Sequence, residues 1–426
     1  MCIVTQEADG HEVERRAQPE LALAQGGGAE AKRVASEESG SSNTYRRDRT
    51  TWAAFGALFA FGFLNAVLGP VLPNIRAVEH ISYLMGALHQ AAFALGGGLA
   101  GLLAARERRM ISRATVIAAG LTGASVAGLA VGYGNRPAIT IPGAMVMSLL
   151  GTSALIRVWA VLADVHGAGR AVAMSEGEVS VSFAGILTPL LIGALAATTL
   201  SWRFAFVLGA GASGLAALWV SRARMPPPAN GRAPAPRENP GAARRWPPPT
   251  LIVVFAIVAL EFSLSFWLAS YLNDDIGLTR DAAAAAVSGL YASNLAGRLL
   301  ASRLARRAGA ERLLAAALGT ALLGLPILLS ASDAPVAIGI AVAGIGIGPM
   351  FPLTSALHVK ANPGSADAAL GQILAIASIG QIAGPLTAGG IAQAASLRAG
   401  LLILPALVLI AAAGLYYHCF CSNPSA

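Results

Sequence analysis

Apolar stretches of about 20 residues recur along the whole chain and are separated by short polar breaks. Each stretch, as a helix rising ~1.5 Å per residue, is long enough to cross a hydrocarbon core of ~30 Å. Within that core only helices and closed barrels satisfy their backbone hydrogen bonds. The pattern therefore predicts an all-α membrane protein with twelve transmembrane helices in two six-helix bundles. The predicted spans cover roughly residues 52–73, 83–104, 114–133, 139–163, 176–199, 203–220, 250–271, 282–301, 313–331, 335–357, 369–392 and 396–417.

A segment rich in proline and arginine separates the two sets of six spans. Residues 222–250 hold nine prolines and six arginines against one acid, Glu238. Such a composition can neither form a core nor cross a bilayer. The predicted domains are a disordered cytoplasmic tail over residues 1–51, a bundle over 52–221, a cytoplasmic linker over 222–249, a bundle over 250–417 and a cytoplasmic tail over 418–426.

Composition and charge support a membrane location and exclude a nucleic-acid binder. Of the 426 residues, 55% are hydrophobic and only 12% are charged, so the chain holds more apolar surface than a soluble domain could bury. Its net charge of +8 resides in the gaps between spans: sixteen basic residues lie in the linker-side gaps and five, including Arg76, in the opposite ones. The positive-inside rule then places the linker and both termini in the cytoplasm.

The two halves resemble each other in sequence. AGLLAARERR (100–109) after the second span aligns with ASRLARRAGA (301–310) after the eighth, and TPLLIG (188–193) has a counterpart in GPLTAG (384–389). Paired repeats of this kind build secondary transporters, in which a site at the membrane midplane lies between two bundles that expose it alternately. Transport is therefore the leading hypothesis.

Twelve spans, a central linker, and basic gaps after spans two and eight resemble the major facilitator superfamily over residues 52–417. The family's loop signature of glycines, an aspartate and bases is matched only in part, and the aspartate is missing from both copies. The first copy corresponds to Gly101, Ala105, Arg106, Arg108 and Arg109, and the second to Ser302, Arg306, Arg307 and Gly309. The resemblance implies a transporter fold in which the family's usual aspartate–arginine pair cannot form from these positions.

A glycine pattern in span eleven resembles the signature of the family's proton antiporters. Those antiporters carry it in span five, where this chain offers only Pro189 and Gly193. Small residues at such spacings also let helices approach closely, so close helix packing is the favoured interpretation over a role in setting direction. The matching residues are Gly371, Gly380, Gly384, Pro385 and Gly389.

Glu261 is the deepest charge in the predicted spans. It lies eleven residues past Thr250, about 16 Å along the helix and so near the bilayer centre. An isolated carboxylate there costs at least ~2.5 to 3.5 kcal/mol, so it must be protonated, paired or hydrated. These properties predict a proton carrier, with a structural ion pair or a ligand for a cationic substrate as alternatives. Glu178, near the start of span five, is a second candidate for proton coupling.

Other polar residues in the spans are candidates for a substrate cavity. Asn294 lies one turn before Arg298 on the same helix face, and Arg157 partly matches an arginine found in span four of the family's drug antiporters. For the arginines, snorkelling and pairing between bundles are the simpler roles. For the amides and His89, the simpler role is a hydrogen bond between helices. The candidate set is Asn65, His89, Gln90, Arg157, Asn294, Arg298, Gln372 and Gln381.

The chain carries no phosphate-binding loop, nucleophile elbow or cluster of metal ligands, so we expect no enzyme activity, cofactor or metal. Its cysteines, Cys2, Cys419 and Cys421, lie in the tails. We expect a monomer in a bacterial inner membrane whose partners are a small-molecule substrate, protons and lipid, and which binds no nucleic acid. The predicted function is proton-coupled efflux of a small organic molecule. The alternatives are proton-symport uptake of a sugar, since GIGIGPMFPLTSAL (344–357) resembles span ten of sugar permeases, and a ligand sensor that transports nothing.

Overall fold

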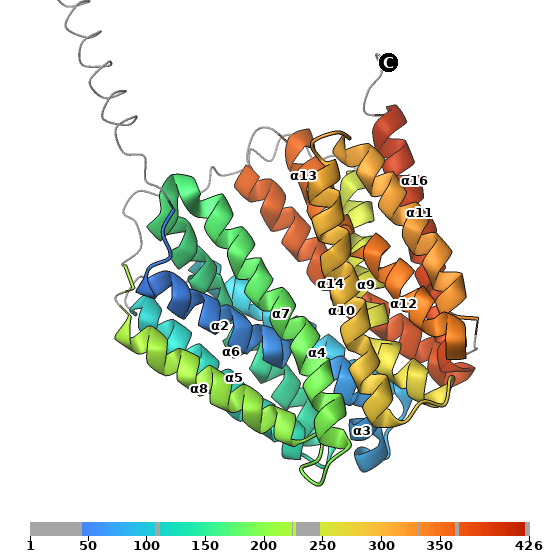
Figure 1. Cartoon of the computed structure of the whole chain (residues 1–426), viewed down its shortest axis with the longest axis horizontal. Helices are drawn as coiled ribbons and strands as arrows, with labels where there is room; N and C mark the ends of the chain where they lie inside the picture. Colours follow the sequence, from blue (N-terminus) through green and yellow to red (C-terminus); the bar gives the residue numbers. More distant parts are fainter. Residues whose placement is uncertain are drawn as a thin grey trace, which may run out of the picture. The chain divides into compact units, whose positions relative to one another are not determined.

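The computed structural model describes residues 45–106, 111–223, 225–226, 248–330, 333–362 and 366–421. Residues Arg47–Ala426 form one compact unit, and every regular element in its described part is a helix (Figure 1). The all-α prediction is confirmed. Most of the predicted N-terminal tail, linker and C-terminal tail lies outside the described residues, so the domain boundaries stay predictions.

The helices follow the predicted spans closely. In the N-terminal half they are α2 (Arg49–Asn65), α3 (Leu68–Glu79), α4 (Tyr83–Arg106), α5 (Arg113–Tyr133), α6 (Pro137–His166), the short η1 (Gly167–Gly169), α7 (Arg170–Ala196) and α8 (Phe204–Arg222). In the C-terminal half they are α9 (Pro249–Asp274), α10 (Arg280–Leu304), α11 (Ala310–Leu328), α12 (Asp333–Ile347), α13 (Met350–Ala361), α14 (Ala366–Ala394), α15 (Leu397–Leu401) and α16 (Ile403–Cys421).

Eleven stretches of the described chain are long and apolar enough to cross a membrane. Three of them, residues 49–79, 335–361 and 397–419, each cover two consecutive helices. The remaining predicted span is α10, which has the length, 25 residues, but is more polar because it holds Arg280, Asp281, Asn294 and Arg298. Helices α7, α9 and α12 pack around α10, and Asn294 is buried among them, so α10 completes the set of twelve.

Proline explains where the first and tenth spans break. A helical residue donates its N–H to the carbonyl four residues earlier, and proline has no N–H. Pro70 therefore leaves the Ala66 carbonyl without its donor, at the junction of α2 and α3. Pro352 does the same to the Gly348 carbonyl at the junction of α12 and α13. Each break frees a backbone oxygen inside the bundle.

The duplication is also visible in the side-chain contacts. In the first half, the Thr51 hydroxyl near the start of α2 lies 2.8 Å from Nε2 of His166 at the end of α6. In the second half, the Thr250 hydroxyl at the start of α9 lies 2.7 Å from Nδ1 of His358, near the end of α13. Each pair joins the first span of its half to the fourth, and all four residues are buried. The two halves therefore repeat the same polar contact.

The halves meet closely at one end of the bundle, which we call the far end; the end where the linker joins α8 and α9 is the linker end. Across the interface α3 packs on α9, α4 on α14 and α7 on α10. Three glycines make this approach possible, because a Cβ on any of them would meet the opposite half. Gly69 would meet Ser265 O at 2.5 Å, Gly193 would meet Asp281 O at 2.6 Å, and Gly389 would meet Ala87 Cβ at 2.8 Å.

The same interface separates toward the linker end. Gly371 is 18 residues before Gly389 on α14, about five turns, so both lie on one helix face. Gly98 is eleven residues after Ala87 on α4 and likewise shares its face. A Cβ on Gly371 or Gly98 would meet nothing within 4 Å. Helices α4 and α14 therefore touch at the far end and diverge toward the linker end.

These distances predict opposite effects for two glycines of the span-eleven pattern. A Cβ on Gly384 would lie 2.5 Å from Ala259 O and 2.6 Å from Ser263 Oγ of α9, so Gly384→Ala should destabilise the protein by about 1–3 kcal/mol. Gly371→Ala is the matched control and should be neutral or stabilising, because alanine favours helices and the position is open. Thermal unfolding of the purified proteins in detergent measures both; equal melting temperatures would contradict the packing argument.

Candidate functional site

Glu261 occupies the middle of the bundle. It is the thirteenth of the 26 residues of α9, as its predicted depth requires. Its side chain is 22% exposed, and its Oε1 lies 3.7 Å from Nη2 of Arg298, whose side chain is 35% exposed. The two charges compensate each other in part, and both side chains remain partly exposed. The prediction that Glu261 is paired, protonated or hydrated is met by this arginine.

The break in the tenth span positions Arg298. Its Nε donates a hydrogen bond of 3.0 Å to the Gly348 carbonyl. That carbonyl is available because Pro352 cannot donate to it. Gly297, the preceding residue, allows α10 to lie directly against α12, since a Cβ there would collide with the Ile345 carbonyl. Sequence features of two helices thus hold the guanidinium beside Glu261.

Glu178 approaches the same arginine from the other half of the protein. Helices α7 and α10 run antiparallel, and a Cβ on Gly185 of α7 would meet Cδ1 of Tyr291 on α10 at 3.3 Å. Seven residues toward the linker end, about two turns, bring Glu178 and Arg298 onto these same facing surfaces. Arg298 attracts the carboxylates of both Glu178 and Glu261. Glu261 therefore lies at ion-pair distance from Arg298, whereas Glu178, an exposed residue of the other half, is attracted by the same charge over a longer distance.

The other predicted cavity residues are distributed over the bundle. Asn65 is exposed at the break between α2 and α3, Gln381 and Arg157 are half-buried, and Gln372 is exposed and accepts a contact of 3.2 Å from His358. The remaining three are buried: His89, Gln90 and Asn294. Asn294, with its amide nitrogen as donor, bonds Gly344 O at 3.0 Å. Arg298, the remaining candidate, lies at ion-pair distance from Glu261 and also attracts Glu178 of the other half.

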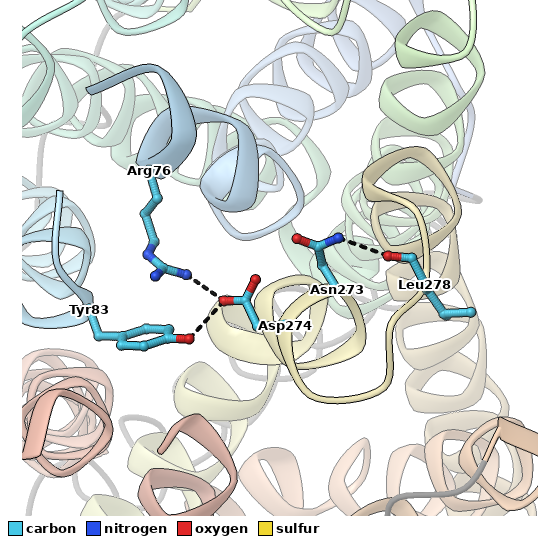
Figure 2. A network of polar contacts seen from close by, with 5 residues as sticks. All are labelled: Arg76, Tyr83, Asn273, Asp274 and Leu278. Carbon is cyan, nitrogen blue, oxygen red and sulfur yellow. Dashed lines mark hydrogen bonds and ion pairs between the residues drawn. The ribbon is translucent and has the colours of Figure 1, made fainter. Parts of the chain in front are cut away.

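A network of polar contacts joins the halves at the far end (Figure 2). Arg76 of α3 donates from Nη1 to Oδ2 of Asp274 at the end of α9, at 2.6 Å, and the Tyr83 hydroxyl donates to the same oxygen at 2.9 Å. The Arg76 guanidinium carbon also lies 3.7 Å from the centroid of the Tyr83 ring, within cation–π range. We call Arg76, Tyr83 and Asp274 the far-end network. It closes this end of the bundle.

Sequence reasoning did not find the far-end network, although a signal was present. Arg76 and Asp274 each lie at the far end of the first span of their half, where internal duplication places equivalent positions close together. Next to the network, burial raises the pKa of Asp275, while a backbone hydrogen bond from Arg398 and the charge of Arg398 act in the opposite direction. The acids at the end of α9 are thus held in different environments.

Charge pairs at the linker end lie within single halves. Nη2 of Arg113 lies 2.7 Å from Oδ2 of Asp164, joining α5 to α6, and Arg47 binds Glu176 of α7 at 2.7 Å. Partial burial acts to raise the pKa of Asp48, but hydrogen bonds from Thr51 and the charge of His166 outweigh it, and the pKa lies below its ordinary value.

The loop signature after span two falls partly outside the described residues. In the described part of the chain, no cluster of His, Cys, Asp and Glu could hold a metal ion.

Two six-helix halves that meet at one end are the architecture of a membrane transporter. Comparison with protein families agrees: the model of the Major Facilitator Superfamily matches residues 54–366 and 250–424, and the chain belongs to this family. A search of curated proteins finds no match.

Solved structures share the fold. A bacterial homolog of the human lysosomal transporter Spinster, inward-facing and unoccupied, has a TM-score of 0.71 at 18% identity, covering 87% of this chain and 97% of that one. The nucleoside transporter NupG has a TM-score of 0.66 at 14% identity, covering 86% and 98%. A D-xylose–proton symporter has a TM-score of 0.65 at 13% identity, covering 86% and 97%. At these identities the likeness establishes the fold alone.

Removing the charge of Arg76 should loosen the far end. In Arg76→Gln the ion pair to Asp274 and the cation–π contact are both lost, and a loss of about 1–2 kcal/mol shifts a two-state ratio about five- to thirty-fold toward an open far end. Double electron–electron resonance measures the distance between the halves. The spin labels are placed at Thr198 and Thr279 in a background without the native cysteines. Arg280 is an exposed arginine at the same end, so Arg280→Gln is the control and should leave the distances unchanged. An unchanged distance distribution in Arg76→Gln would show that the network does not hold this end.

Proposed function

We propose that this protein is a proton-coupled secondary transporter that exports a small organic molecule, and that the proton and the molecule compete for the carboxylates of Glu261 and Glu178. The observation that carries the proposal is the group of two acids and one base between the halves. Arg298 can compensate only one negative charge. The second carboxylate needs a proton or a cationic group to be stable away from bulk water.

Competition for one negative charge favours exchange over cotransport. If a cationic group occupies the surplus carboxylate, the proton must leave, and if a proton occupies it, the cation is released. The proposed substrate class is therefore an organic cation or amine. Glu178 belongs to the other half from Glu261 and Arg298, so rocking of the halves changes its distance from both and hence the strength of its interaction with Arg298.

The arrangement described here supports loading from the linker end, because the far end is closed and α4 and α14 diverge toward the linker. We place the linker end in the cytoplasm on the basic residues of its gaps. An organic cation would then enter from the cytoplasm and leave on the opposite side as a proton enters. The residues proposed to carry the coupling are Glu261 and Glu178, and Arg298 positions both.

Flux in vesicles tests the proposal. The purified protein is placed in vesicles with an acidic lumen and a pH-sensitive dye, and tetraphenylphosphonium, ethidium or xylose is added outside. Exchange with a cation should raise the luminal pH, and Glu261→Gln should slow this by at least about tenfold because its side chain cannot carry the proton. Glu311→Gln, an acid at the linker end paired with Lys360 at 3.6 Å, is the control and should match the wild type.

The other outcomes select the alternatives. A fall in luminal pH when xylose is added identifies symport of the sugar. Binding of a cation without any pH change identifies a sensor that does not transport. Equal flux in Glu261→Gln and the wild type would remove Glu261 from the coupling and leave it a structural acid.

A further inference from the structure

A second group of titratable residues lies at the far end, entirely within the N-terminal half. The Thr140 hydroxyl of α6 lies 2.8 Å from Oε1 of Glu79, the last residue of α3, and 2.9 Å from Nε2 of His89 on α4. Nδ1 of His89 in turn lies 3.3 Å from the Gly86 carbonyl. We call these contacts the Glu79–Thr140–His89 chain. His89 and Thr140 are completely buried.

For all three contacts to be hydrogen bonds at once, the Glu79–Thr140–His89 chain has to hold one more proton than its separate residues would carry at neutral pH. A hydrogen bond needs one hydrogen between its two heavy atoms, so three bonds need three hydrogens. Thr140 supplies one and a neutral imidazole supplies another. An ionised Glu79 supplies none, and with His89 neutral one contact would bring two lone pairs together. When the 3.3 Å contact between Nδ1 and the Gly86 carbonyl is also a hydrogen bond, the third proton is bound, either to Glu79 or to His89.

Two arrangements of the same protons satisfy every contact. In the first, Glu79 is protonated and donates to Thr140, Thr140 donates to Nε2, and Nδ1–H donates to the Gly86 carbonyl. In the second, the Glu79 proton has moved to the Thr140 oxygen while the Thr140 proton has moved to Nε2, leaving a carboxylate and an imidazolium. Nδ1–H is unchanged, and one proton has passed from Glu79 to His89. Thr140 also lies 3.2 Å from the Arg136 carbonyl, and a bond donated there would only raise the number of protons needed.

A further buried atom favours a bound proton. The second carboxyl oxygen of Glu79, Oε2, is buried and accepts no hydrogen bond from the described residues. A carboxylate oxygen without a donor is costly to bury, and protonation of the group removes that cost. The charged and titratable residues at the far ends of the surrounding helices include Arg76 and His80 of the α3 end, Tyr83 of α4, Tyr133 of α5, Arg136 before α6, Asp274 of α9, and Arg280 and Asp281 of α10.

The Glu79–Thr140–His89 chain is connected to the far-end network through α3 and α4. Glu79 lies one turn after Arg76, which binds Asp274 of the other half. Gly86, whose carbonyl faces His89, packs against the Arg76 side chain. A Cβ added to Gly86 would lie 3.4 Å from Cδ of Arg76. Loss of the proton would break a contact of His89, Thr140 or Glu79 and so disturb the helix turn that presents Arg76.

We propose that Glu79, Thr140 and His89 form a proton-binding site at the far end, separate from Glu261, whose occupancy favours the closed arrangement of the far-end network. Binding is stronger in the closed arrangement, so closure is favoured at low pH and is lost as the pH rises through the titration of the site. The site binds its proton whether or not Glu261 couples transport, and the two proposals can fail independently.

Infrared difference spectroscopy of the full-length protein in lipid nanodiscs tests proton binding directly. A pH-dependent C=O band of a protonated carboxyl should disappear in Glu79→Gln and persist in Glu261→Gln apart from that residue's own contribution. Thr140→Val, which keeps the shape but removes the hydroxyl, should shift or remove the band, while Thr140→Ser should retain it. A spectrum that is the same in Glu79→Gln and the wild type overturns the site.

Coupling to the far end has its own readout. With spin labels at Thr198 and Thr279, the ratio of closed to open distances in the wild type should fall with rising pH, by up to about tenfold per pH unit across the titration. This dependence should be lost in Glu79→Gln and Thr140→Val and kept in Thr140→Ser and in Glu311→Gln, whose acid lies at the linker end. If Glu79→Gln keeps the wild-type dependence on pH, the site does not control the far end, and that part of the proposal is wrong.

Discussion

The interior of this bundle depends on one constraint, which is that a charge buried away from water must find a partner. Arg298 is the partner for acids of both halves, and it is held in place by a carbonyl that a proline left without its helical donor. The contact between Gly185 and Tyr291 fixes α7 against α10 and so sets where Glu178 meets Arg298. Backbone geometry in three helices therefore decides the electrostatics of the space between the halves.

Two kinds of polar contact stabilise the protein, and they differ in what they join. The pairs Thr51–His166 and Thr250–His358 connect spans of the same half and are repeated by the duplication. The Arg76–Asp274 pair connects the two halves, as does the attraction between Glu178 and Arg298. Contacts of the first kind keep each half rigid. Those of the second kind must rearrange when the halves move, which makes them the natural places for control by charge.

The sequence predicted the helices, the duplication and the depth of Glu261 because each is determined by local composition and by distance along one helix. It did not predict that Asn294 bonds the backbone of the tenth span, or that His89 bonds Thr140, since those partners are set by how helices rotate about their axes. Periodicity indicates which residues share a face, but a span that is apolar on every side does not reveal which face meets which neighbour. The far-end network depends on the same information.

The divergence of α4 and α14 gives the bundle the geometry of a lever. Their contact at Gly389 and Ala87 lies near one end, and Gly371 lies 18 residues away on the same face of α14, an arm of about 27 Å. A rotation of only about 20° around the contact would carry Gly371 roughly 9 Å, the spacing of two packed helices. A small pivot that leaves the glycine contact intact therefore moves the linker end by about the spacing of two helices, while the side chains at the pivot need hardly move.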